Sequence, residues 1–333
     1  MGKKIAVILA GAVARGAFEA GALEVLAKRD VEIVRIVAAS SGALNATVLA
    51  GGVCAGDVPR ATAKLASLWE TAATLGGVFD VNLGDVFRLE GVSDSSKLVR
   101  LLDSNVAPCA DPRPVQVKFV VTSLRGVQAN IGAEAATTHE LVFSFDESDF
   151  KNRERLTRVF GAATASAAFP IAFAPADLGP EYGPCVDGGV VNNTPMKYAL
   201  GDDIAAVVVI ACSPQSLTLP TGHGGMDLLG DFADILIDER LYRDLREAED
   251  VNRSLERLDK LNLGGDELRR VKEAIGWTGR RQIEIVTIRP AEILPGNMFS
   301  GFTSGSLRQQ YLGLGRDAAN KALADAWGGS FSC

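Results

Sequence analysis

The sequence predicts an α/β fold in which a mainly parallel central sheet is flanked by helices, with a helical annex towards the C-terminus. Short apolar runs rich in valine, isoleucine and alanine alternate along the chain with segments of helical periodicity. Continuous apolar runs of this kind are typical of parallel strands that are covered on both faces. The chain has 333 residues, which is enough for one large domain.

The expected elements follow these runs in order. Strands are predicted over residues 4–10, 33–38, 116–123, 139–144, 183–187, 205–212 and 282–288. Helices are predicted over residues 17–28, 42–51, 58–75, 154–167, 227–262 and 306–327. We therefore expect one domain over residues 1–333, made of an α/β core at 4–215, a helical segment at 226–275 and a C-terminal strand and helix at 282–333.

The first predicted strand also imitates a secretory signal peptide. Two lysines precede the apolar run 5–10, and Ala12-Val13-Ala14 imitates a cleavage site. The run is short for a signal peptide and Arg15-Gly16 follows directly, so we interpret it as a buried strand and expect a cytoplasmic protein. No stretch approaches the ~20 apolar residues that a membrane-spanning helix needs.

The helical segment 226–275 has dense mixed charge over residues 238–273. Within it Leu241, Leu245 and Leu255 recur at helical spacing, so one face of the helix is apolar. A solvated surface helix, a lid and a dimer contact each account for this pattern.

Composition limits the partners. The net charge is −7 and no basic patch carries interleaved aromatic residues, which disfavours nucleic acid. The same charge disfavours simple electrostatic attraction to anionic lipid. The five cysteines are scattered without a CxxC pair, which suits free thiols in a reducing compartment. Histidines and carboxylates show no zinc or calcium spacing, so we expect no metal and no cofactor; the oligomeric state is not indicated.

The loop over residues 11–16 joins the first strand to the first helix, where backbone N–H groups can bind an anion or an oxyanion. It is not a Walker loop, because no GK[ST] ends it. Val13 stands where a dinucleotide-binding loop needs its second glycine. An oxyanion hole and a turn kept small for packing remain as alternatives.

The second motif is Ala38-Ala39-Ser40-Ser41-Gly42-Ala43-Leu44-Asn45-Ala46. An apolar strand that turns sharply into a helix around a serine is typical of a nucleophile elbow, which presents the serine Oγ at a helix N-terminus. The usual pattern is G-x-S-x-G, and Ala38 replaces its first glycine. The alternative is an ordinary strand-to-helix loop with Ser40 as the N-cap.

The third motif is Asp187-Gly188-Gly189-Val190-Val191-Asn192-Asn193-Thr194-Pro195. An aspartate that ends an apolar segment and precedes two glycines can lie close to another backbone with its carboxylate available. Asp-Gly is also a common turn, so Asp187 by itself indicates little.

Taken in order, the three motifs resemble those of the patatin-like phospholipase family. The likeness includes the blocks 41–46, 165–170 (Ala-Ser-Ala-Ala-Phe-Pro), 173–175 (Phe-Ala-Pro) and 187–195. It covers residues 4–213, and beyond them only 299–314 looks like a family tail. The resemblance implies a three-layer sandwich and a serine acyl hydrolase of the phospholipase or carboxylesterase type. Its substrate would be a lipid or a small ester, with transient contact to membrane surfaces.

The resemblance also implies a Ser–Asp dyad. Ser40 would attack the ester carbonyl, and Asp187 would accept its proton and return it to the leaving alcohol. Water activated by the same carboxylate would then release the acid. The amides of Gly11, Ala12 and Val13 would hold the oxyanion.

Four further positions would support the site: Arg15, Gly16, Gly42 and Gly188. Arg15 matches a basic position of the family, where it would orient the loop or contact a substrate phosphate. The alternative is that Arg15 is a surface residue or only packs against the loop.

A Ser-His-Asp triad would have to use His139 or His223, because the chain has only two histidines. His139 is expected near the start of a strand and His223 in a glycine-rich loop. We therefore expect both to be structural or surface residues.

The loop departs from the family pattern, in which consecutive glycines precede x-R-G. Here Ala12 and Val13 take two of those places, and a donor that needs positive φ would be most strained at the β-branched Val13. The departure motivates an alternative: a catalytically weak or silent protein that binds lipids or partners on the same scaffold. A dinucleotide-binding enzyme is a third alternative, which Val13 disfavours.

Overall fold

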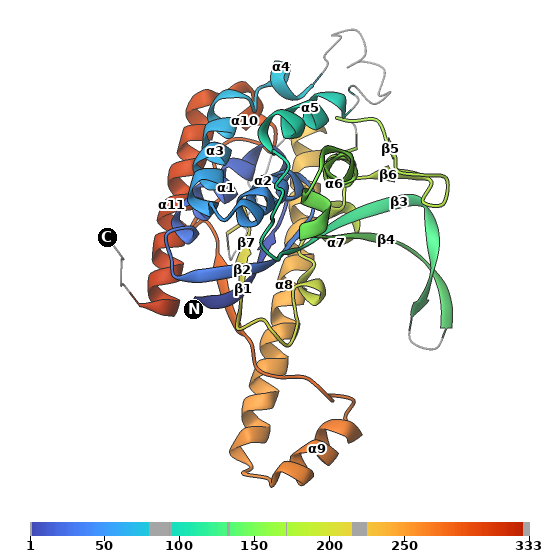
Figure 1. Ribbon diagram of the computed structural model, residues 1–333, viewed down its shortest axis with the longest axis vertical. Coiled ribbons are helices and arrows are strands. Elements are labelled where there is room, and N and C mark those ends of the chain that lie inside the picture. Colours follow the sequence, from blue (N-terminus) through green and yellow to red (C-terminus); the bar gives the residue numbers. More distant parts are fainter. Residues whose placement is uncertain are drawn as a thin grey trace.

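The computed structural model describes residues 2–79, 93, 95–131, 134–170, 172–214 and 225–328. An eight-stranded sheet lies at its centre, and helices cover both of its faces (Figure 1). The α/β class and the flanking helices predicted from the sequence are confirmed.

The sheet is parallel at its centre and antiparallel at one side. Its strands are β1 (Lys3–Leu9), β2 (Val31–Ala38), β3 (Gln116–Ile131), β4 (Glu134–Asp146), β5 (Ala176–Asp177), β6 (Pro184–Val186), β7 (Ala206–Ile210) and β8 (Glu284–Ile288). Their order is β5-β6-β3-β2-β1-β7-β8, with β4 also paired to β3. The path from β3 to β8 is parallel, whereas β4, β5 and β6 join antiparallel.

The helices are α1 (Ala17–Leu26), α2 (Ser41–Ala55), α3 (Val58–Thr71), α4 (Leu75–Val78), α5 (Ser96–Asn105), α6 (Arg153–Ser166), α7 (Gly189–Asn192), α8 (Gly225–Lys260), α9 (Gly265–Ala274), α10 (Ser300–Thr303) and α11 (Gly305–Trp327). Short 3-10 turns occur at Val13–Gly16, Glu147–Phe150 and Met196–Tyr198.

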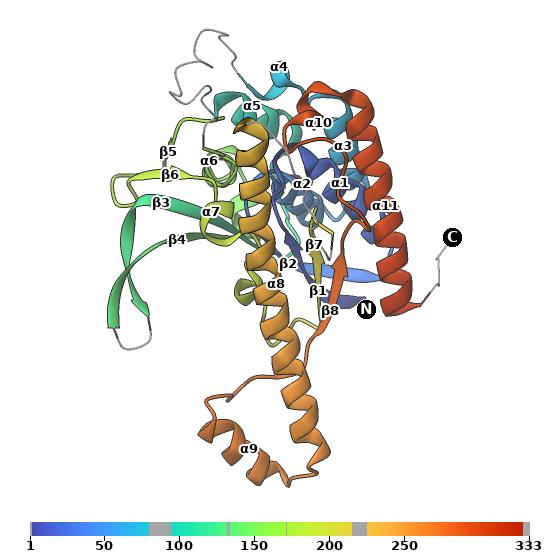
Figure 2. The same cartoon turned by 180° about the vertical axis from the view of Figure 1, so that it is seen from behind.

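Alternate residues of β1 face two different cores, as the period of a strand requires. Val7 and Leu9 lie in the larger core, which includes residues of α1, α2 and α11. Ile8 lies in the smaller core with Leu241 and Leu245 of α8. Figure 2 shows α8 crossing the face of the sheet opposite to α1 and α2.

Two glycines let α1 and α11 pack closely along their lengths (Figure 1). A Cβ on Gly21 would lie 2.1 Å from the Leu312 carbonyl oxygen, and one on Gly315 would lie 2.0 Å from that of Phe18. No side chain fits at such distances, so the C-terminal helix is built into the main body of the fold.

The register of β1 brings the first two motifs together. Leu9, at the carboxyl end of β1, is paired with Ala38 of β2 on one side and with Ile210 of β7 on the other. The loops that follow parallel strands emerge at the same edge of the sheet. The loop 11–16 and the turn at Ser40 therefore lie next to each other.

The structure adds elements that the sequence pattern does not predict. The hairpin of β3 and β4 extends beyond the predicted strands 116–123 and 139–144, with exposed polar residues such as Gln128. Helix α5, which buries Leu98 and Leu102, is also absent from the prediction. Helical periodicity is detected over windows of about 11–18 residues, and α5 has 10 residues.

The predicted helical segment 226–275 is present as α8 and α9, which form an arm. The lower end of α8 and all of α9 project away from the sheet, at the end of the molecule opposite to α4, α5 and α10 (Figures 1 and 2). Within the described residues, no helix has both the length and the apolar character to cross a membrane.

Candidate active site

Ser40 occupies the sharp turn between β2 and α2, with φ 55° and ψ −140°. A positive φ is strained for a residue that has a Cβ atom. The packing around the turn leaves no room for larger neighbours. A Cβ on Gly42 would lie 2.5 Å from the Leu9 carbonyl oxygen, and one on Gly11 would lie 2.1 Å from Ser40 Cβ. The turn has the strand-to-helix geometry that the sequence predicts.

The structure brings Ser40 and Asp187 into direct contact. Ser40 Oγ donates a hydrogen bond of 2.6 Å to Asp187 Oδ2. Asp187 follows β6 and precedes α7, and its other carboxylate oxygen accepts the Gly189 N–H at 2.7 Å. The Asp187 carbonyl oxygen accepts the Thr122 hydroxyl at 2.7 Å. The carboxylate is thus held at a fixed distance from the serine.

Gly188 lets the Asp187 turn approach β3. A Cβ on Gly188 would lie 2.0 Å from the Val120 carbonyl oxygen, which is an impossible contact. Only glycine fits there, and the third motif needs its first glycine for this reason.

Burial alters the acidity of Asp187, whose exposed fraction is 2%. Desolvation raises the pKa of this carboxyl from its ordinary value of 3.8 to about 7, against the opposing effect of the hydrogen bonds from Ser40 and Gly189. A carboxylate with such a pKa can both accept and return a proton near neutral pH.

The loop 11–16 lies beside Ser40, and Val13 has φ 52°. The strain predicted for this β-branched residue is confirmed. The Ala12 N–H donates to Ser41 Oγ at 3.1 Å, so it is already bound. In the described part of the chain the amides of Gly11 and Val13 have no acceptor. The Gly11 carbonyl oxygen is fixed by Asn193 Nδ2 at 2.9 Å.

Ser166, at the end of α6, connects the turn at Ser40 to the sheet. Its Oγ accepts the Ser40 N–H at 3.0 Å and donates to the Val120 carbonyl oxygen at 2.6 Å. Its carbonyl oxygen accepts the Gly188 N–H at 3.0 Å. Ser166 belongs to the block 165–170, and its sequence motif assigned it no role. A serine flanked by alanines near a helix end is the signal that could have identified it.

Arg15 and Gly16 contact other parts of the fold. Arg15 has an exposed fraction of 7%, and its Nη2 donates to the Gly296 carbonyl oxygen at 3.1 Å. This position matches the alternative in which Arg15 orients the loop, since its guanidinium binds the C-terminal segment. Gly16 allows Trp69 to approach, because a Cβ there would lie 2.5 Å from Trp69 Cζ2.

His139 lies on β4 with its side chain exposed, and its Nδ1 is 2.7 Å from the Ser123 carbonyl oxygen. The described hydrogen-bond partners of the Asp187 carboxylate are Ser40 and Gly189, and neither is a histidine. His223 lies outside the residues that the structure describes.

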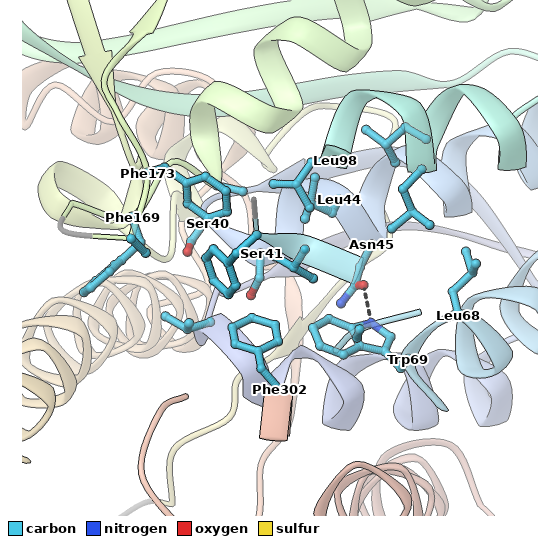
Figure 3. Close-up of a pocket in the computed structure, with 18 of the residues that line it drawn as sticks. Ser40, Ser41, Leu44, Asn45, Leu68, Trp69, Leu98, Phe169, Phe173 and Phe302 are labelled. Carbon is cyan, nitrogen blue, oxygen red and sulfur yellow. Dashed lines mark hydrogen bonds between the residues drawn. The ribbon is translucent and has the colours of Figure 1, made fainter. Parts of the chain in front are cut away.

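An apolar pocket opens beside Ser40 (Figure 3). Its described lining comes mainly from α2, α3, α5, α10 and the segments around residues 78 and 170. The lining residues are Val13, Ser40, Ser41, Leu44, Asn45, Val48, Leu65, Leu68, Trp69, Ala73, Val78, Phe79, Leu98, Leu101, Leu102, Ala167, Phe169, Ala172, Phe173 and Phe302. None of these residues is charged, and none comes from α8 or α9. The pocket therefore suits a hydrocarbon chain.

The polar groups in this lining are already bound. Asn45 Nδ2 donates to Glu19 Oε2 at 2.7 Å, and Asn45 Oδ1 accepts the Trp69 indole N–H at 2.8 Å (Figure 3). Burial raises the pKa of Glu19 well above its ordinary value of 4.5. Ser41 accepts the Ala12 amide, as described above. Ser40 is then the lining residue left to react with a ligand.

Potential metal ligands and cysteine thiols occur at several positions among the described residues. Among the described residues, no three His, Cys, Asp or Glu side chains are grouped so as to hold a metal ion. Cys54, Cys109, Cys185 and Cys212 are free thiols.

Comparison with protein families assigns the sequence to one family. A sequence model described as patatin-like phospholipase matches residues 7–200. The match spans more than half of the 333 residues, and the chain belongs to the patatin-like phospholipase family. Family membership supports a lipid hydrolase function and a lipid substrate. The comparison with curated proteins gives no match.

Two solved structures are similar to the chain at low sequence identity. VipD from Legionella pneumophila shares 13% identity with a TM-score of 0.42, over 98% of this chain and 67% of VipD. ExoU from Pseudomonas aeruginosa, solved in complex with SpcU, shares 16% identity with a TM-score of 0.31, over 74% of this chain and 51% of that chain. The match thus covers about half the length of the ExoU chain.

Proposed function

We propose that the protein is a serine acyl hydrolase that cleaves carboxylic esters of apolar acids through a dyad of Ser40 and Asp187. The observation that carries the proposal is the hydrogen bond of 2.6 Å between Ser40 Oγ and Asp187 Oδ2 beside an apolar pocket. A serine needs a base within hydrogen-bond distance to act as a nucleophile near neutral pH. Asp187 is that base.

In the first half of the reaction, Ser40 Oγ attacks the ester carbonyl carbon while its proton moves to Asp187 Oδ2. The tetrahedral intermediate collapses when the protonated Asp187 gives this proton to the leaving alcohol oxygen. An acyl-enzyme on Ser40 and a free alcohol result. The pKa of about 7 at Asp187 suits both transfers, because neither protonation state is strongly disfavoured.

In the second half, a water molecule takes the position of the alcohol. Asp187 accepts a proton from this water, and the hydroxide formed attacks the acyl carbon. Collapse of the second tetrahedral intermediate returns the proton to Ser40 Oγ and releases the carboxylic acid. Protons and charges therefore balance over the cycle.

The oxyanion is stabilised by the amides of Gly11 and Val13, together with the N-terminal end of α2. These two amides are the ones that the described hydrogen bonds leave available. The Ala12 amide instead fixes the loop through Ser41 Oγ. Val13 adopts a strained left-handed conformation in the loop that faces Ser40, and the rest of the fold must offset this strain.

The substrate is selected by its acyl chain. The described lining of the pocket holds no charged side chain, and the side chains of Ser41 and Asn45 already make hydrogen bonds within the protein, so we expect no phosphate to be recognised within it. Phospholipids, acylglycerols and simple esters all present such a chain. A lipid in a membrane would reach the pocket during transient contact of the protein with the membrane surface.

A second candidate function is lipid binding without hydrolysis. The bound Ala12 amide and the strained Val13 favour it, because an oxyanion hole with fewer donors stabilises the transition state less. The intact Ser40–Asp187 pair favours the hydrolase.

Exposure of the protein to a fluorophosphonate probe, followed by intact mass measurement, separates the two functions. A hydrolase should gain one adduct in the wild type and none in Ser40→Ala. An unlabelled but folded wild type would contradict the hydrolase proposal. Hydrolysis of p-nitrophenyl butyrate by both proteins gives the matching activity measurement.

A further inference from the structure

The C-terminal segment Pro295–Thr303 contributes Phe302 to the described lining of the acyl pocket, although it lies outside the family match at 7–200. Its Phe302 lines the pocket with an exposed fraction of 7%. In Figure 3 the Phe302 ring lies beside the Trp69 ring, on the same side of the pocket. An acyl chain that fills the pocket therefore contacts this ring.

The segment is fixed directly to the loop that faces Ser40. The Ala14 N–H donates to the Met298 carbonyl oxygen at 3.1 Å, and Arg15 Nη2 donates to that of Gly296 at 3.1 Å. A Cβ on Gly301 would lie 2.6 Å from the Ala14 carbonyl oxygen, so glycine permits the close approach. These contacts leave α10 little freedom to move away from the pocket.

Three aromatic rings from separate segments meet across the pocket. The rings of Phe302 and Phe79 are 5.2 Å apart in a T-shaped arrangement, and those of Phe79 and Phe173 are 5.0 Å apart. Contacts of this kind stabilise one another beyond the burial of their surface. The three residues therefore form a continuous aromatic part of the pocket wall.

The space enclosed by the pocket wall is small. The pocket has a free volume of about 80 Å³, whereas pockets for drug-sized ligands occupy roughly 300–1,000 Å³. Apart from Ser40, Ser41 and Asn45, the described lining around it is aliphatic or aromatic. A short acyl group fits this space, and a long one requires a side chain of the lining to move.

We propose that Phe302 limits the length of the acyl chain that the pocket accepts, so that the protein prefers esters of short-chain acids. This inference rests on the proposed hydrolase function, because it assigns the pocket to the acyl group of the substrate. It makes the C-terminal segment, rather than the family-matched part of the chain, a determinant of specificity.

Chain-length profiles test the inference. The values of kcat/KM for p-nitrophenyl esters of C4 to C16 acids should fall beyond short chains in the wild type. In Phe302→Ala the ratio of the C12 to the C4 value should rise by about tenfold or more, because one methylene in an apolar pocket already changes selectivity about tenfold. The ratio in Phe302→Leu should lie between those of the wild type and Phe302→Ala. The leucine variant replaces the alanine variant in this test if the latter does not fold.

Phe299→Ala is the matched control. Phe299 belongs to the same segment and packs on Phe169 at 5.9 Å, but its own side chain is not part of the described pocket lining. Its removal also deletes one ring contact with a pocket-lining phenylalanine and should leave the C12 to C4 ratio near the wild-type value. An equal ratio in wild type, Phe302→Ala and Phe302→Leu, or an equal rise in Phe299→Ala, overturns the inference.

A binding measurement separates this inference from the proposed function. Hexanoate, decanoate and palmitate are titrated into Ser40→Ala and into Ser40→Ala/Phe302→Ala, with heat of binding as the readout. The double variant should gain affinity for palmitate at least tenfold relative to hexanoate. If the wild type hydrolyses no ester but this gain is present, the hydrolase proposal fails and the role of Phe302 stands. Absence of the gain overturns the role of Phe302 whatever the activity.

Discussion

The backbone N–H of Ser40 donates a hydrogen bond of 3.0 Å to the side-chain oxygen of Ser166, which lies 126 residues further along the chain. The same hydroxyl donates to the Val120 carbonyl oxygen on β3. One side chain thus fixes the strained nucleophile turn to the sheet. We interpret Ser166 as a positioning residue, since it contacts the backbone of Ser40 and not its Oγ.

Ser166→Ala should lower kcat without changing KM. The variant leaves the buried Ser40 N–H without an acceptor, and such a loss costs about 1–3 kcal/mol. If that cost falls on the alignment of the nucleophile, kcat drops by roughly ten- to a hundredfold. Steady-state kinetics with p-nitrophenyl butyrate give both constants, and Ser166→Thr should restore part of kcat by returning the hydroxyl.

Thr164→Val is the control for this effect. Thr164 is buried in the same helix, and its hydroxyl donates to the Phe160 carbonyl oxygen within that helix. The variant should change the melting temperature but not kcat. Equal losses of kcat in both variants would show that Ser166 contributes only to the stability of α6.

Ser40→Ala and Asp187→Asn should each reduce ester hydrolysis about a thousandfold or more, because groups that act as one catalytic unit are lost together. His139→Ala should retain most of the activity, since the His139 ring contacts the Ser123 carbonyl oxygen on an exposed hairpin. Initial rates of ester hydrolysis by the three variants show which side chains the reaction needs. A fully active Asp187→Asn, or an inactive but folded His139→Ala, would require a different base.

The value of kcat/KM should rise with pH through an apparent pKa near 7. Asp187 must be ionised to accept the Ser40 proton, and burial raises its pKa to about 7. An exposed carboxylate would instead place this limb near pH 4. A pH profile between 5 and 9 measures it, and a rate that is constant from pH 5 to 7 would contradict the assignment of Asp187 as the base.

Asp187→Asn should stabilise the protein at pH 8 more than at pH 5. The pKa of Asp187 is higher in the folded protein than its ordinary value of 3.8, so the folded state binds more protons between pH 3.8 and about 7. The associated stability is present at low pH and is lost as the pH rises through about 7. Each unit of pKa difference corresponds to ~1.4 kcal/mol. Urea unfolding of both proteins at the two pH values tests the difference.

Val13→Gly should be more stable than Val13→Ala by about 1 kcal/mol, the reverse of the usual order. Both variants lose the branched side chain, but only glycine adopts φ 52° without strain. Ala63→Gly, at an exposed position within α3, is the control and should destabilise by ~1 kcal/mol. If Val13→Ala were the more stable of the pair, Val13 would not be strained in solution.

The central part of the fold could be predicted because its strands are continuous apolar runs. β1, β2 and β7 are buried on both faces, and their alternation with α1 and α2 leaves few other arrangements. The outer extension of the β3–β4 hairpin and helix α5 could not be predicted in the same way. The extension carries exposed polar residues such as Gln128, and α5 is a short helix of 10 residues.

The site could be predicted where it depends on local geometry. Gly11, Gly42 and Gly188 each belong to one of the three motifs. A Cβ added at any of these positions would lie 2.0–2.5 Å from a neighbouring atom, so only glycine fits. The roles of Ser166, Thr122 and Asn193 depend on contacts between residues far apart in the chain. Spacing in the sequence carries no such information.

The attachment of the C-terminal segment to the loop after β1 has a consequence for the order of events during synthesis. The nascent chain carries Ser40 and Asp187 by the time about 200 residues have been made, but β7, which flanks β1, and the contacts of Ala14 and Arg15 with residues 296–298 are still missing. Because domains fold as their parts emerge from the ribosome, we expect the proposed hydrolase activity to appear only after residues 296–298 have been translated. Late assembly of this kind would keep partly made molecules from attacking lipids at the place where they are synthesised.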